Sequence, residues 1–129
     1  MTTFRELLLI NNSNYEPNDR SPLDEWFKDI LDIHLEELEV GDVARAIRQD
    51  LFLAEILPKD EIILRQDPLA GEDYDGQLIS SIASLNSNEA KAVLPYLLRI
   101  SSYLNQLDKA LFDNQNITDI EKIEKLSHY

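Results

Sequence analysis

The sequence predicts an all-α fold, a single-domain compact bundle of about five to seven helices. Leucine and isoleucine dominate the apolar residues while valine is scarce, which favours helix over strand. Apolar residues recur every three or four positions along most of the chain, as they do on one face of a helix. With 129 residues, 43% of them hydrophobic, the chain can bury a core of its own, so we expect one domain over residues 1–129.

The N-terminal segment, residues 1–20, is expected to be irregular. The sequence does not decide whether its first residues form a strand or a helix. The segment NNSNYEPNDRSP (11–22) has the composition of a loop. Ser21 followed by Pro22 predicts a helix start, because the serine hydroxyl can cap free N–H groups and proline lacks one at no cost in the first turn. This helix is expected to run to about Ile33.

The middle of the chain predicts two helices divided by a proline. Gly41 is expected to break the preceding segment, and Asp42 has a suitable side chain to cap the helix that follows. An apolar stripe then runs through 43–57 and widens towards its end, which is typical of a helix central to a core. Pro58 is expected to end this helix and begin another. That second helix should stop at Asp67, because the residue before a proline disfavours the α conformation.

The C-terminal part of the chain predicts the remaining helices. Residues 74–85 form one stripe, and 87–88 can cap a longer one that carries leucines as far as Leu111. Pro95 within the longer stripe requires either a kink or two abutting helices. Thr118 begins TDIE, which matches the capping-box pattern, so the last helix is expected to start there.

Charge is the most informative bulk property. The net charge is −13, and residues 1–75 hold 19 acidic against 7 basic side chains, so nearly all of the excess lies there. Such a surface repels nucleic acid and anionic membranes, and it attracts basic partners. We therefore expect neither nucleic acid nor membrane as a partner. Simple solubility is the alternative explanation of the acidic excess.

Two absences in the sequence bear on location. The chain has no cysteine, which excludes disulfides and thiolate metal sites. No apolar run approaches the roughly 20 residues of a membrane-spanning helix, and the N-terminus lacks the basic start and apolar core of a signal peptide. We expect a soluble, cytoplasmic protein.

The segment DPLAGEDYDGQL (67–78) is the strongest candidate for a chemical site. As a calcium loop with Gly76 at its sixth position, it would have Gly71 in place of the first ligand and Ile82 in place of the closing glutamate. As a catalytic acid cluster, it lacks a neighbouring histidine, lysine or arginine. No Ser-X-Gly pattern or glycine-rich phosphate loop occurs elsewhere. We expect no enzymatic activity, no cofactor and no metal.

Two blocks of sequence resemble a known family. VGDVARAIRQDLFLAEILP (40–58) followed by DPLAGEDYDGQL (67–78) is similar in order and spacing to immunity proteins of bacterial contact-dependent growth inhibition systems. The resemblance covers about residues 38–85. Asp50 stands where that family's pattern has asparagine, and Gln77 stands where it commonly has an acid.

The resemblance implies a small antidote that binds the C-terminal toxin domain of a cognate CdiA-type effector, commonly a nuclease. The antidote would hold the toxin inactive without chemistry of its own, and whether it forms a homo-oligomer stays open. We expect DPLAG to be a structural turn and an acidic surface from 24–42 and 72–75 to meet a basic toxin surface. The candidate toxin-binding residues are Tyr15, Asp29, Asp32, Glu36, Glu37, Glu39, Glu72, Asp73, Tyr74 and Asp75.

Two other functions remain open at the level of sequence. An acidic DNA mimic that inhibits a nucleic-acid enzyme would also carry many carboxylates, although arginines interrupt them here. A helical adaptor without an inhibitory role would show the same solvated acidic helix faces.

Overall fold

The computed structural model describes residues 2–13, 15 and 21–128. These residues form helices and no strand, which confirms the all-α prediction. They contain eight α-helices, slightly more than expected. The chain divides into two compact units, Met1–Glu39 and Val40–Tyr129. A single domain over residues 1–129 stays a prediction.

The first unit holds α1 (Phe4–Ile10), α2 (Pro22–Ile30) and the 3-10 helix η1 (Leu35–Glu37). Ser21 caps α2 as predicted, since its hydroxyl oxygen accepts a hydrogen bond from the N–H of Asp24 at 3.1 Å. Helix α2 ends at Ile30 rather than near Ile33, because the residues after it turn to bring His34 into a backbone bridge with Thr3.

Helix α1 corrects the expectation of an irregular segment over residues 1–20. Thr3 caps α1, because its hydroxyl accepts a hydrogen bond from the N–H of Glu6 at 3.2 Å. Buried Phe4 of α1 then packs edge-on against buried Phe27 of α2, with ring centroids 5.3 Å apart. Burial of this aromatic pair favours helix over loop at the start of the chain. Residues 14 and 16–20 of the expected segment lie outside the described part of the structure.

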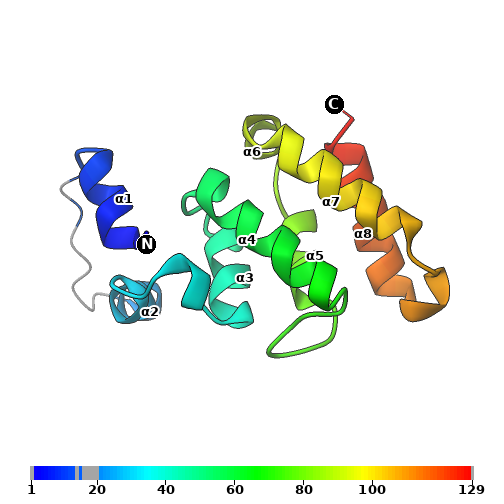
Figure 1. The fold of residues 1–129 in the computed structure, drawn as a ribbon, viewed down its shortest axis with the longest axis horizontal. Coiled ribbons are helices and arrows are strands. Elements are labelled where there is room, and N and C mark those ends of the chain that lie inside the picture. The colour runs from blue at the N-terminus through cyan, green and yellow to red at the C-terminus, as the bar shows by residue number, and fades with distance from the viewer. Residues whose placement is uncertain (1, 14, 16–20, 129) are drawn as a thin grey trace. The chain divides into compact units, whose positions relative to one another are not determined.

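The second unit is a ring of packed helices (Figure 1). Helix α3 packs on α5, α5 on α8, α8 on α7, α7 on α4, and α4 back on α3. The elements of this unit are α3 (Val40–Arg48), α4 (Leu53–Gln66), α5 (Gln77–Ala83), α6 (Ser87–Ala92), α7 (Leu94–Gln106), η2 (Lys109–Leu111) and α8 (Asn114–Leu126).

Helix α5 supplies the centre of this unit. It is only seven residues long, yet Leu78, Ile79 and Ile82 are fully buried. A helix this short is not stable alone in water, so its packing on α3 and α8 must stabilise it. The predicted helix over residues 74–85 is therefore correct in place but begins later, after Gly76, whose φ of +83° starts a new turn.

The predicted helix over residues 42–57 is wrong, because the chain turns at 49–52. Gly41 and Asp42 lie inside α3 rather than before it. The turn is a Schellman motif, in which the N–H of Leu51 donates to the carbonyl of Ala46 at 2.9 Å and the N–H of Asp50 to that of Ile47 at 3.0 Å. The apolar stripe thus belongs to two helices that pack on each other.

Pro58 does not end a helix, as the sequence suggested, but lies inside α4. Proline removes the hydrogen bond to the carbonyl of Ala54, four residues earlier, and Ala54 is exposed, so water can solvate that carbonyl. Ile56 and Leu57 before the proline and Leu64 after it are all buried. Burial along one continuous helix outweighs the lost bond.

The C-terminal stripes divide at Val93, which confirms two abutting helices at Pro95. Both caps differ from the expected residues. Asn86 caps α6 in a capping box with Glu89, in place of residues 87–88. Asp113 caps α8, because its side chain accepts from the N–H of Asn116 at 2.7 Å, whereas Thr118 lies within the helix. Asn116 stands where the usual capping box has glutamate or glutamine, so the pattern did not reveal the start of α8.

Asp60 is a buried carboxyl group in α4 that should reduce stability. It is fully buried, and neither carboxyl oxygen has a hydrogen-bond partner among the described residues. Burial raises the pKa of Asp60 well above its ordinary value of 3.8. The folded state therefore holds a proton that the unfolded state releases as pH rises above about 3.9. Stability contributed by this group is present at low pH and is lost as pH rises.

We expect Asp60→Asn to raise the free energy of unfolding at pH 7, by about 1–3 kcal/mol, since it removes the cost of protonation. The gain should shrink by up to about 1.4 kcal/mol for each pH unit below pH 7. Urea unfolding between pH 5.5 and 8 measures it. Exposed Asp67→Asn, which removes the same charge from the surface, is the control. A gain that is independent of pH at Asp60 would contradict this account.

Asp50 occupies the left-handed position of the Schellman motif, with φ +54°, where glycine or asparagine is usual. Its carboxylate also follows the negative end of α3. Partial desolvation raises the pKa of Asp50, and Glu89 of α6 adds to the shift through its charge and a hydrogen bond. An uncharged asparagine would therefore suit this position better than aspartate.

Asp50→Asn should raise the free energy of unfolding by about 0.5–1 kcal/mol at pH 7, because asparagine tolerates the left-handed conformation and carries no charge. Asp108→Asn, at an exposed cap, is a matched control in which the substitution keeps the capping group. Thermal or urea unfolding gives the difference. Equal or lower stability of the Asp50 variant would show that the motif does not select the residue.

Candidate functional site

The clearest candidate site is the loop between α4 and α5 in the second unit (Figure 1). We call its exposed residues Glu72, Asp73, Tyr74 and Asp75 the acidic corner. Backbone hydrogen bonds close the loop beneath them: the N–H of Gly76 donates to the carbonyl of residue 69 at 2.9 Å, and that of residue 78 to the carbonyl of residue 70 at 3.1 Å. The corner is therefore a fixed turn rather than an open loop.

Gln77 ties the acidic corner to the first turn of α5. Its side chain is buried, and its Oε1 accepts from the N–H of Glu72 at 2.7 Å and from the N–H of Asp73 at 3.1 Å. Its Nε2 donates to a carboxylate oxygen of Asp73 at 3.2 Å. One amide group thus satisfies two backbone donors and one acceptor, which a carboxylate at this position could not do. Gln77 therefore supports the backbone of the corner and adds no charge to it.

Gly71 is required where the loop passes close to itself. A Cβ atom at this position would overlap the carbonyl oxygen of Tyr74 and the Cβ of Gln77. At the other end, Glu72 lies against Gly41 in the first turn of α3, where the helix dipole favours a carboxylate. These contacts support the interpretation of DPLAG as a structural turn.

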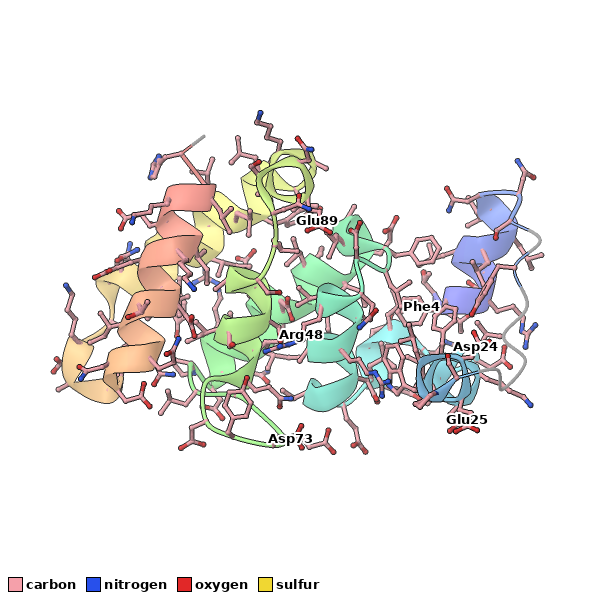
Figure 2. All side chains as sticks on the ribbon, turned by 180° about the vertical axis from the view of Figure 1, so that it is seen from behind. Phe4, Asp24, Glu25, Arg48, Asp73 and Glu89 are labelled. Carbon is pink, nitrogen blue, oxygen red and sulfur yellow. The ribbon has the colours of Figure 1, made fainter. Side chains whose placement is uncertain are left out.

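Arg48 of α3 holds Tyr74 in place. Its Nε donates to the Ser81 hydroxyl at 3.0 Å, and its Nη2 donates to the Ser80 hydroxyl at 3.2 Å and the Tyr74 hydroxyl at 3.1 Å. Figure 2 shows Arg48 between α3 and α5, and Asp73 on the loop. Tyr74 is 50% exposed although its hydroxyl is bound, so its ring is presented to solvent in one orientation.

The other candidate residues lie in the first unit. The Tyr15 hydroxyl donates to a carboxylate oxygen of Asp24, and its ring lies 6.0 Å from that of Phe27. Asp32 is paired with Arg5, whose Nε donates at 2.6 Å and Nη2 at 3.1 Å. The hydrogen bond from Arg5 lowers the pKa of the Asp32 carboxyl. The remaining candidates of this unit are exposed acids: Asp29, Glu36, Glu37 and Glu39.

The candidates thus form two sets, six in Met1–Glu39 and four in Val40–Tyr129. Within the described residues, no three histidine or acidic side chains are grouped so that they could hold a metal ion. No helix in the same residues is long and apolar enough to cross a membrane.

A comparison with protein families identifies what the chain is related to. The family model for CDI immunity proteins, those of contact-dependent growth inhibition, matches residues 9–98. The chain belongs to this family. A search of curated proteins gives no match. The matched range includes α2 to α6, the whole acidic corner and the Schellman motif at Asp50.

Sequence reasoning missed two residues that shape this immunity protein's acidic corner. No role was predicted for Arg48, because its partners in α5 are more than 30 residues away in sequence. Gln77 was noted only as a departure from the family pattern. Its position four residues after Asp73, at a helix start, was the one available signal of a local hydrogen bond.

We expect Gln77→Ala to lower the free energy of unfolding by about 1–3 kcal/mol, because it removes three hydrogen bonds from a buried amide. The N–H groups of Glu72 and Asp73 should exchange with solvent faster. Hydrogen exchange and urea unfolding together measure this. Gln49→Ala, in an exposed turn, is the control. Unchanged exchange at both amides would mean that Gln77 does not hold the corner.

Proposed function

We propose that this immunity protein neutralises the C-terminal toxin domain of a CdiA-type effector by binding it. Membership of the CDI immunity family is the observation that carries the proposal. An antidote of this kind needs no chemistry of its own, since holding the toxin in an inactive complex is sufficient. Family membership also favours this function over a DNA mimic or a helical adaptor. The site of action would be the cytoplasm, where a delivered toxin is active.

The charge of the protein supports a nuclease as the toxin. Nucleases bind phosphates with basic grooves, and a protein of net charge −13 complements such a surface. The acidic corner offers carboxylates on a rigid support, because Gln77 and the closed loop fix its backbone. A fixed surface loses little conformational entropy on binding, which favours affinity.

Tyr74 is the proposed anchor of this contact. Tyrosine is enriched among the residues that dominate binding energy at interfaces. Here the ring is half exposed, and the bond from Arg48 already fixes its orientation. Among the exposed acids of the first unit, Asp32 is a weaker candidate, because Arg5 already neutralises it.

The direct test is co-purification with the toxin domain encoded immediately upstream of the immunity gene, together with rescue of cells that express that domain. A stable complex and growth in the presence of the toxin are the expected results. Absence of both would exclude an antidote for that toxin. An assay of the purified domain on DNA and RNA, with and without the immunity protein, then tests whether the inhibited activity is that of a nuclease.

We expect charge reversal at Asp73 and Asp75, as Asp73→Lys with Asp75→Lys, to slow association with the toxin domain by about tenfold at low salt. The effect should fade as salt screens the charges. Stopped-flow or surface-binding kinetics give the rates. Glu121→Lys with Glu124→Lys on α8 makes the same change in net charge and is the control. Equal association rates for the two variants would exclude the acidic corner as the surface that steers the toxin.

A further inference from the structure

Helices α4 and α7 lie side by side in the second unit (Figure 1). They carry an open groove whose lining includes no residue of the acidic corner. Its volume is about 260 Å³. The lining is arginine, tyrosine, leucine and neutral polar side chains, with no carboxylate: Arg65, Leu98, Arg99, Ser102, Tyr103 and Gln106. On a protein with twice as many acidic as basic residues, this composition is unusual.

One glutamate holds the two arginines at the groove. Glu61 of α4 accepts from the Nε of Arg65 at 3.2 Å and from the Nε of Arg99 at 2.9 Å, using one carboxylate oxygen for each. Each guanidinium also lies over a tyrosine ring, Arg65 at 4.7 Å from the centroid of Tyr103 and Arg99 at 4.9 Å from that of Tyr96. Both guanidinium groups are therefore fixed in orientation before any partner binds.

The arginines keep donors available for a ligand. Both hydrogen bonds to Glu61 use Nε, so the Nη groups have no acceptor among the described residues. The two side chains are 51% and 50% exposed, while that of Glu61 is 17% exposed. Two positive charges with free N–H groups thus face the solvent over one shielded negative charge. Such a pair suits a carboxylate or phosphate oxygen.

Charge decides between these ligands. A nucleic acid would meet the field of a protein with net charge −13 before it reached two arginines. A protein partner that is basic as a whole can still present a single carboxylate at close range. Arginine and tyrosine are also the side chains most often found at the energetic centres of protein interfaces. Leu98, 41% exposed in the groove, adds apolar contact area for a protein surface.

We propose that this groove binds an acidic side chain of the toxin domain, with Arg65 and Arg99 donating to its carboxylate. The proposal rests on the proposed function, because the partner is the same toxin. It assigns a second contact of opposite charge to the acidic corner. The carboxylate lies between the two guanidinium groups, and the tyrosine rings and Glu61 hold these in position.

The experiment measures binding of the upstream-encoded toxin domain to the full chain and to Arg65→Gln with Arg99→Gln. We expect the dissociation constant to rise at least tenfold, mainly through faster dissociation. Lys122→Gln with Lys125→Gln on α8 removes the same charge and is the control. Since loss of positive charge improves attraction to a basic toxin, the control should bind as well as the unmodified protein or slightly better. Groove variants that behave like this control would overturn the proposal.

One further variant and the unmodified protein keep the test independent of folding and of the proposed function. Arg65→Lys with Arg99→Lys retains the charge and loses the planar guanidinium, so it should show an intermediate loss of affinity. This variant takes the place of the double glutamine variant if the latter does not fold. An unmodified protein that fails to bind the toxin refutes the proposed function, whereas unmodified binding with unaffected groove variants refutes the groove alone. Self-association that disappears in the groove variants would assign the groove to a second copy of the chain and overturn the toxin contact.

Discussion

Burial of α5 is the constraint on which the second unit depends. This helix has seven residues and packs on both α3 and α8, so it is the link that joins these two helices in the ring. Leu78, Ile79 and Ile82 on it are all fully buried. Because so short a helix cannot persist in water, the segments on either side must deliver it to its place. The loop before it, with the acidic corner, is consequently as well defined as the helix itself.

The support of α5 comes from residues in the two sequence blocks, 40–58 and 67–78, that carry the resemblance to the family. Arg48 in the first block reaches Ser80, Ser81 and Tyr74. Gly71 and Gln77 in the second block shape the turn. These contacts hold α5 against α3 and the loop, and they leave the carboxylates of the corner exposed. Different atoms of the same segment therefore support the fold and face the solvent.

Periodicity predicted the helices well where the apolar stripe agreed with the local signals for a helix start or end. Ser21 with Pro22, the stripe of α8 and the division near Pro95 all came from local patterns. The failures have a common physical cause. The stripe of residues 43–57 continues across the turn at Asp50, since both helices bury it, so the pattern alone could not show the break. At Pro58 the sequence predicted a helix end that the structure does not have, because packing stabilises a continuous helix that proline locally disfavours.

The two proposed contacts act over different distances, and α4 connects them. Arg65 lies in the last turn of α4, and the loop that bears the acidic corner begins at Asp67. Carboxylates exposed on the corner attract a basic toxin from a distance of about one Debye length, roughly 8 Å at physiological salt, and so govern association. The arginine groove acts only in contact, where paired N–H groups require an acceptor at hydrogen-bond distance, and so governs dissociation. A toxin surface with basic charge alone would satisfy the corner but not the groove. In the proposed complex, discrimination between basic toxins would therefore depend on the groove, because two arginines left without a carboxylate would face the positive charge of the toxin.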